Sequence, residues 1–228
     1  MHWGQFFCRI KCSGNRLLVS LCLVIPVIVL ATEGFGISDD TIERVYREHG
    51  RRARNILLDW RELVDKNRHA TDKAKLSAVN RFFNRRIRFV SDKRHWGRND
   101  YWATPVETMV SRGGDCEDYS IAKYFTLRAL GVPDERMRIT YVRAKRLRQA
   151  HMVLTYYPSP QAEPLVLDNL TRKIQPASKR RDLIPVYSFN ASNLWMAKER
   201  GRGRLVGSSS NVNLWRDVMN RIRRKALP

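Results

Sequence analysis

The apolar residues in the first half of the chain recur at helical spacing. Ser38, Asp39 and Asp40 supply a cap and an acidic first turn for a helix that is expected to run to about residue 66. Its predicted inward positions are Ile42, Val45, Ile56, Leu57, Trp60, Leu63 and Val64. A second helix is expected at 74–85, after the capping pair Thr71 and Asp72. This part of the chain is therefore predicted to be helical.

The pattern then changes to short apolar runs with strand-like alternation. A short strand is expected at 87–90, and strands at 150–157 and 165–170 are expected to form an antiparallel hairpin. Between them lies a turn-rich aromatic stretch, 92–104, which is too long and too aromatic for a linker and is typical of loops that line a site. Helices first and an antiparallel sheet later indicate an α+β fold.

The segment 1–31 has the composition of an export signal. Arg9, Lys11 and Arg16 precede an apolar run at 17–30, and the predicted cleavage site at the end of this run is the triplet 29–31, which ends at Ala31. A retained membrane anchor is the alternative, although Pro26 interrupts the run and a spanning helix needs about 20 apolar residues. We therefore predict a signal peptide at 1–31 and a single domain at 32–228 in an exported protein.

The chain carries a formal net charge of +21. Its Lys and Arg residues are spread along the whole sequence, without zinc-finger spacing, an RNA-binding aromatic signature or a glycine-rich phosphate loop. A basic, solvated surface explains this pattern, and no nucleic-acid partner is expected. The most concentrated basic stretch is 216–225, which is interpreted as a basic C-terminal tail.

Cys116 is the only cysteine left once the export segment is removed. It has no disulfide partner in its own molecule, so nucleophilic chemistry explains it better than a structural role. It begins a predicted helix with Ile121, Phe125 and Ala129 on the inward face. In a first turn the backbone N–H groups and the helix dipole favour a thiolate.

His151 and Asp168 lie on the two strands of the predicted hairpin. If the turn is centred near residues 159–160, His151 lies directly across from Asp168, and residues so paired project from one face of a sheet. With Cys116 they form a Cys-His-Asp set in which the histidine takes the thiol proton and the aspartate fixes the tautomer of the ring. A surface histidine and a turn aspartate are the alternatives, and His95 is the reserve candidate for the base.

Several motifs of the sequence resemble those of the bacterial transglutaminase-like cysteine proteinases of the LapG type. The resemblance covers about 75–195 and is carried by NDYWATP at 99–105, GDCEDY at 114–119 with AKYF at 122–125, AHMVL at 150–154, PLVLDN at 164–169 and PVYSFN at 185–190. Cys116, His151 and Asp168 occupy the family's catalytic positions.

The resemblance implies a papain-like, transglutaminase-like fold and a periplasmic endopeptidase. Such an enzyme clips the N-terminal region of a very large surface adhesin, which releases the adhesin and disperses a biofilm. The resemblance also implies control by an inner-membrane cyclic-di-GMP receptor of the LapD type. The alternatives are a transglutaminase-type acyl transferase, which would use the same three residues, and a non-enzymatic basic periplasmic adaptor. The oligomeric state stays open.

The resemblance further implies calcium, which the acidic residues beside Cys116 support. Asp115, Glu117 and Asp118 place three hard oxygen donors next to one another, and Asp100 offers a fourth. Without a cation these carboxylates would raise the pKa of the thiol by like-charge repulsion. The alternative is that they only solvate the helix start and complement its dipole.

Trp96 lies in the aromatic stretch beside Arg94 and Arg98. An exposed Trp with adjacent Arg has the composition of a binding hot spot, so Trp96 is the predicted contact for the receptor. Burial, or a place in the substrate groove, is the alternative. The backbone N–H of Cys116 is the expected oxyanion donor, and Trp96, Asn99 or Trp102 is expected to position or supply a second.

Overall fold

The computed structural model describes residues 37–198 and 201–226. The predicted signal peptide lies outside these residues. The helices are α1 (Asp39–Asn67), α2 (Asp72–Arg86), α3 (Asp92–His95), α4 (Pro105–Ser111), α5 (Cys116–Ala129) and α6 (Asn213–Ala226). None of the helices in the described part of the chain is long and apolar enough to cross a membrane.

Two sheets accompany the helices. The small parallel pair joins β1 (Arg88–Phe89) to β2 (Gly113–Gly114). The main sheet has seven strands, all paired antiparallel, in the order β6-β5-β4-β3-β7-β8-β9. These strands are β3 (Met137–Ala144), β4 (Gln149–Tyr156), β5 (Leu165–Leu167), β6 (Gln175–Pro176), β7 (Leu183–Phe189), β8 (Asn193–Lys198) and β9 (Gly201–Ser208). The predicted α+β class, with helices before an antiparallel sheet, is confirmed.

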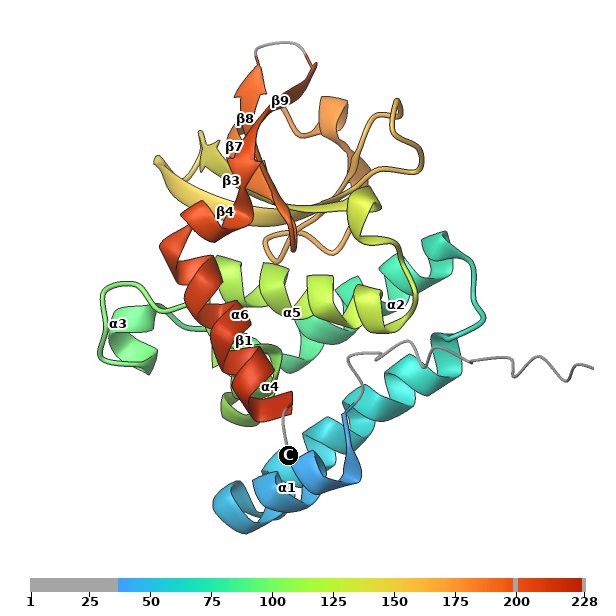
Figure 1. Cartoon of the computed structure of the whole chain (residues 1–228), viewed down its shortest axis with the longest axis vertical. Helices are drawn as coiled ribbons and strands as arrows, with labels where there is room; N and C mark the ends of the chain where they lie inside the picture. Colours follow the sequence, from blue (N-terminus) through green and yellow to red (C-terminus); the bar gives the residue numbers. More distant parts are fainter. Residues whose placement is uncertain (1–36, 199–200, 227–228) are drawn as a thin grey trace, which may run out of the picture. The chain divides into compact units, whose positions relative to one another are not determined.

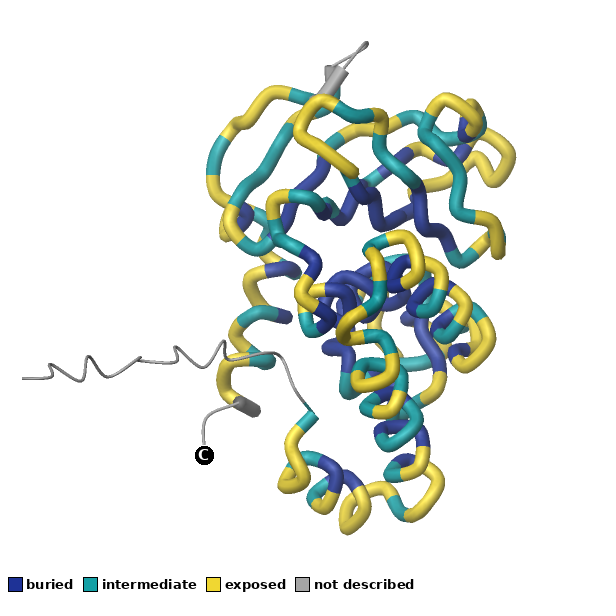
Figure 2. The backbone as a smooth tube through the Cα atoms, turned by 90° about the vertical axis from the view of Figure 1, so that its right-hand side faces the viewer, coloured by how far each residue is buried: buried dark blue, intermediate teal, exposed yellow. Residues whose placement is uncertain are grey.

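The helix α5 is the centre of the hydrophobic core. It packs against β4 and β3 on one side and against α2 on the other, while α1 packs against α4 and α2 (Figure 1). The buried stretches of backbone gather where the helices meet the sheet (Figure 2). A buried hydrogen bond of 2.8 Å from the indole N–H of Trp60 to the Thr126 hydroxyl ties α1 to α5. Cys116 at the start of α5 is therefore held on a rigid element.

The predicted first helix is interrupted. Ser38 caps it as expected, its hydroxyl accepting the backbone N–H of Thr41 at 3.2 Å. At Gly50, however, the backbone has φ 78° and ψ −176°, a conformation open mainly to glycine. The helical pattern continues on both sides of this break, which is why the sequence was interpreted as one helix.

Three helices, α3, α4 and α6, were not expected from the sequence, and α3 lies within the stretch 92–104 that was expected to be turn-rich. Thr104 and Glu107 form a capping box, with Pro105 at the first turn, and so begin α4. The described part of the basic C-terminal stretch is helical, because Trp215 and Val218 of α6 are buried in the core. Arg221 of α6 donates to the Tyr101 hydroxyl at 2.8 Å and pairs with Glu107. The C-terminal helix thus anchors the aromatic stretch.

Candidate active site

Cys116 is positioned by a short strand that turns directly into a helix. Strand β2 ends at Gly114, Asp115 is the N-cap residue, and Cys116 is the first residue of α5. Asp118 lies so close to the strand that a Cβ at Gly114 would approach its carboxylate to 2.6 Å, so this position requires glycine. The buried Asp118 accepts the backbone N–H of Ala103 at 2.7 Å and that of Asp115 at 3.3 Å. The side chain of Asp118 therefore joins the aromatic stretch to the helix start.

His151 and Asp168 meet as expected, but by a different register. Their Nε2 and Oδ1 atoms are 2.8 Å apart, and both side chains are buried. Leu154 pairs with Leu167, so continuing this register would place Leu170, rather than Asp168, opposite His151. The prediction of a direct cross-strand pair was wrong, because the turn is centred further along the chain than residues 159–160. A shift of two positions leaves the two residues on the same face, where they are diagonal neighbours.

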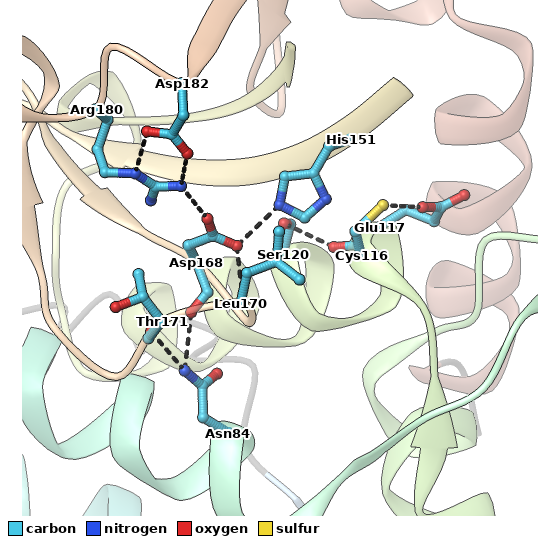
Figure 3. Close-up of polar contacts among 10 residues, drawn as sticks. All are labelled: Asn84, Cys116, Glu117, Ser120, His151, Asp168, Leu170, Thr171, Arg180 and Asp182. Atoms are coloured by element: carbon cyan, nitrogen blue, oxygen red, sulfur yellow. Dashed lines mark hydrogen bonds and ion pairs between the residues drawn. The ribbon is translucent and has the colours of Figure 1, made fainter. Parts of the chain in front are cut away.

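Arg180 completes the environment of Asp168. Its Nη2 lies 2.7 Å from Asp168 Oδ2 and 2.9 Å from Asp182 Oδ2, while the N–H of Leu170 donates to Asp168 Oδ1 at 3.0 Å (Figure 3). Burial would raise the pKa of Asp168, but hydrogen bonds from His151, Leu170 and Arg180 outweigh it and lower this pKa to about 2. Sequence analysis missed Arg180, which lies outside every motif of the resemblance.

The sulfur of Cys116 lies on the other side of His151. Since Nε2 of His151 is held by Asp168, Nδ1 is the ring nitrogen on the side of Cys116 (Figure 3). The backbone N–H of Met152, the next residue of β4, interacts with the sulfur. The thiol itself lies 2.9 Å from Glu117 Oε2, as a donor to that carboxylate. Burial and the charge of Glu117 raise the pKa of Cys116, so the thiol keeps its proton in this arrangement.

The predicted acidic residues gather beside Cys116, with one addition. Donor atoms within 4.8 Å of one another occur in three overlapping sets: Asp115, Cys116 and Glu117; Asp92, Asp100 and Glu117; and Asp92, Asp115 and Asp118. Asp92, which sequence analysis missed, is 3% exposed and belongs to two of the sets. It stands in the first turn of α3, far along the chain from the acidic residues that flank Cys116, so sequence proximity gave no signal for it.

The acidic cluster consists of Asp92, Asp100, Asp115, Glu117 and Asp118. Its negative charges lie close together without a positive charge in the described part of the chain to balance them. Burial, followed by the charges of Glu117 and Asp118, raises the pKa of Asp115 to about 10, and burial raises that of Asp92 to about 6. Burial also raises the pKa values of Asp118 and Asp100. One oxygen each of Asp92 and Asp115 is buried without a hydrogen-bond partner among the residues described. Carboxylates crowded in this way fit a hard divalent cation such as calcium, which takes several oxygen ligands.

The aromatic residues of the stretch separate into two environments. Trp102 is 5% exposed and stacks on Phe189, with ring centroids 5.7 Å apart, so it belongs to the core. Trp96 is half-buried between His95 and Tyr101, at centroid distances of 4.5 and 5.0 Å. Trp96 is therefore only partly exposed, and its role as the receptor contact stays a prediction. The reserve base His95 packs over the backbone of Gly113, and burial lowers its pKa.

Comparison with known proteins agrees with this geometry. The family model described as bacterial transglutaminase-like cysteine proteinase BTLCP matches residues 58–201. An EGTA-treated structure of Legionella pneumophila LapG is 44% identical, covers 82% of this chain and 98% of its own, and superposes with a TM-score of 0.73. A calcium-bound structure of the same protein is also 44% identical, covers 80% and 98%, and gives 0.70.

A further structure of Legionella pneumophila LapG is 43% identical and gives a TM-score of 0.72, with the chain covered to 82% and that structure to 98%. None of the curated proteins compared with the chain matches it. The matched span contains Cys116, His151, Asp168 and the acidic cluster. The chain belongs to the bacterial transglutaminase-like cysteine proteinases.

Proposed function

We propose that this protein is a calcium-dependent periplasmic cysteine endopeptidase that cleaves the N-terminal region of a large surface adhesin. The observation that carries the proposal is the arrangement around His151, which is held by a buried, ionised Asp168 on one side and faces Cys116 at a helix start on the other. This arrangement contains a nucleophile, a base and a group that orients the base. Its residues lie within a chain of the cysteine proteinase family.

The chemistry begins with transfer of the Cys116 proton to Nδ1 of His151. The thiolate attacks the scissile peptide carbonyl, and the backbone N–H of Cys116, at the free end of the helix ladder, stabilises the oxyanion. The imidazolium then donates its proton to the leaving amine, which gives an acyl-enzyme. Water activated by His151 hydrolyses this acyl-enzyme. Asp168 keeps Nε2 of the ring protonated and stabilises the imidazolium through the 2.8 Å contact.

Asp92, Asp100, Asp115, Glu117 and Asp118 are the residues proposed to hold calcium. The ion would offset the negative charge that raises the pKa of the Cys116 thiol. The calcium-bound structure of Legionella pneumophila LapG supports this assignment, because that protein is 44% identical over 80% of the chain. Glu117 belongs to the cluster and also accepts the thiol hydrogen, so drawing its carboxylate toward a cation would release the sulfur for His151.

The adhesin substrate, export to the periplasm and control by a cyclic-di-GMP receptor complete the proposal. They rest on the resemblance to LapG-type enzymes and on the signal-like segment 1–31. A transglutaminase-type acyl transfer would use the same acyl-enzyme and differ only in whether an amine or water resolves it. A non-enzymatic adaptor is disfavoured, because nothing in a binding role requires the buried hydrogen bond between His151 and Asp168.

The test uses the protein purified after export of the full-length chain. It is incubated with purified N-terminal regions of large adhesins in calcium or in EGTA, together with a fluorescent primary amine, and products are mapped by mass spectrometry. Defined fragments formed in calcium alone, and absent with Cys116→Ala, are the expected result. Incorporation of the amine without fragments would replace hydrolysis by acyl transfer. Intact adhesin under every condition would refute the endopeptidase proposal.

Receptor capture is tested separately at Trp96. We expect Trp96→Glu to weaken co-purification with the periplasmic domain of the receptor, because the half-buried ring lies in the aromatic stretch beside Arg98. Tyr46→Glu is the matched control, since Tyr46 is an aromatic residue 44% exposed on α1. Equal loss of capture and adhesin cleavage would assign Trp96 to the substrate groove, and unchanged capture would reject this surface.

A further inference from the structure

A cavity lies away from the catalytic residues. It has a volume of about 600 Å³ and is formed by α2 together with residues of β4, β5 and the segments that follow these two strands. Cys116, His151 and Asp168 do not line it. Its size is that of a binding pocket for part of a ligand rather than of a packing defect.

The rim of this pocket is basic. Lys73, Arg81, Arg85 and Arg172 line it, and no acidic residue does. All four are exposed, and none forms an ion pair with another residue in the described ranges 37–198 and 201–226. The nearby Asp72 is already engaged by the Tyr156 hydroxyl at 2.6 Å and by Arg136. The four cations are therefore available to an anionic ligand.

The floor of the pocket adds two hydrogen-bond acceptors. The amide nitrogen of Asn84 donates to the carbonyls of Asp168 and Thr171 at 2.8 and 3.2 Å, and that of Asn80 donates to Arg172 O at 3.3 Å. These bonds fix the orientation of both amides, so each Oδ1 is an acceptor. Both Oδ1 atoms are buried and lack a donor among the residues described, and Asn80 is 1% exposed.

The remaining wall is apolar, formed by Leu76, Leu165 and Ile174. An ion such as phosphate would satisfy the basic rim, but it would leave this wall uncovered and bring few donors to the two amide oxygens. A peptide brings all three complements: carboxylates for the rim, backbone N–H groups for the asparagines and aliphatic side chains for the wall. Arginine and lysine rims recognise carboxylates through charge-assisted hydrogen bonds.

We propose that this pocket is a docking site for an acidic, aliphatic peptide segment of the protein substrate, separate from the scissile bond. That the peptide belongs to the substrate rests on the proposed endopeptidase function, whereas binding itself does not. Asn84 links the pocket to the catalytic residues, because the same amide that lines the floor donates to the backbone carbonyl of Asp168 (Figure 3). A peptide bound in the pocket would therefore stabilise the loop that carries Asp168.

The test measures binding without proteolysis. The probe is a short fluorescein-labelled peptide of alternating Asp and Leu residues, and its anisotropy is followed on titration with the exported protein. The double variant Arg81→Glu and Arg85→Glu should weaken binding at least about tenfold, because two charge-assisted contacts are replaced by repulsion. Lys73→Glu with Arg172→Glu should act in the same direction. This second pair keeps the test decisive if the first variant fails to fold.

The matched control is Arg51→Glu with Arg52→Glu, which makes the same change in net charge on the exposed surface of α1. The control should bind the probe like the wild type, and a peptide of alternating Lys and Leu should not bind. Equal weakening by the control would mean that the probe binds through the general positive charge of the surface and not through this pocket. Displacement of the probe by an equal concentration of inorganic phosphate, or binding of anionic phospholipid vesicles without binding of the peptide, would overturn the peptide assignment.

The two proposals fail in different ways. Binding of the probe by a protein that cleaves no adhesin would leave the pocket standing and refute the endopeptidase. Adhesin cleavage with an unchanged KM in both pocket variants would refute substrate docking and leave the endopeptidase intact.

Discussion

The two sides of the candidate active site differ in how completely the chain supplies hydrogen-bond partners and balancing charges for their carboxylates. On the sheet side, both carboxylate oxygens of Asp168 have partners, in His151, Leu170 and Arg180, and the pKa of Asp168 is lowered to about 2. On the helix side, the carboxyl groups of Asp92 and Asp115 have raised pKa values, and one oxygen of each has no hydrogen-bond partner within the described part of the chain.

The sheet side of the site is therefore preorganised, whereas the helix side needs a bound cation to balance its charge. The histidine and its aspartate are oriented by side-chain and backbone groups of this chain, so substrate or cation need not assemble them. The cysteine lies among carboxylates that favour its protonated form. Control of activity is therefore expected to act through the helix side, and the following predictions test that division.

The largest effect is expected from removing the nucleophile or the base. Cys116→Ala and His151→Ala should each lower the rate of peptide cleavage by more than about a thousandfold, because the members of such a unit act together. Asp168→Asn should retain more activity, since nucleophile and base stay in place. Rates on a purified adhesin fragment, with melting temperatures as the folding control, decide the matter. An active His151→Ala protein would transfer the role of the base to His95.

Loss of the cation should have the next largest effect. EGTA should abolish cleavage and lower the melting temperature, and added calcium should raise it with concentration, because a ligand of the native state stabilises that state. Asp92→Asn should weaken calcium binding by about tenfold or more, as measured by calorimetry, since a charged ligand becomes neutral. Asp65→Asn on the exposed surface of α1 is the control. Wild-type calcium affinity in Asp92→Asn would remove Asp92 from the site.

Asp168 should also make the stability of the protein depend on pH. Because its folded pKa is about 2, below the ordinary 3.8, its contribution is complete above about pH 4 and is lost as the pH falls toward 2. At neutral pH this contribution is roughly 2 kcal/mol. Urea unfolding of the wild type and Asp168→Asn, both in EGTA, should show a difference that shrinks in acid. A difference independent of pH would mean that the charge of Asp168 does not stabilise the fold.

The smallest effect is expected at Arg180, a positioning residue that acts through Asp168. Arg180→Ala should lower kcat by about tenfold with little change in KM, because one charge-assisted hydrogen bond to the orienting carboxylate is lost. Arg180→Lys should recover part of kcat, since it restores the charge without the planar fork. The neighbouring exposed Arg181→Ala is the control. Equal kcat values for Arg180→Ala and Arg181→Ala would contradict the positioning role.

Local sequence signals predicted much of the fold. Ser38 and Thr71 cap α1 and α2 as expected, and α5 begins at Cys116. Such signals act over a single turn, so they can be read without tertiary information. The capping box at Thr104 was an equally local signal for α4, but the sequence analysis ended the aromatic stretch at that residue and assigned no structure to the segment that follows. The apolar spacing of Trp215 and Val218 was a comparable signal for α6, hidden by the basic residues around it.

The sequence by itself determined the chemical groups: a lone cysteine at a helix start, carboxylates beside it, a histidine on one strand and an aspartate just after the next. Only the tertiary structure decided which of them meet. It set the strand register that makes His151 and Asp168 diagonal neighbours, and it brought in Arg180 and Asp92 from other segments. The physical reason is that charge, polarity and capping belong to single residues and their neighbours, whereas register and burial depend on packing between segments distant in sequence.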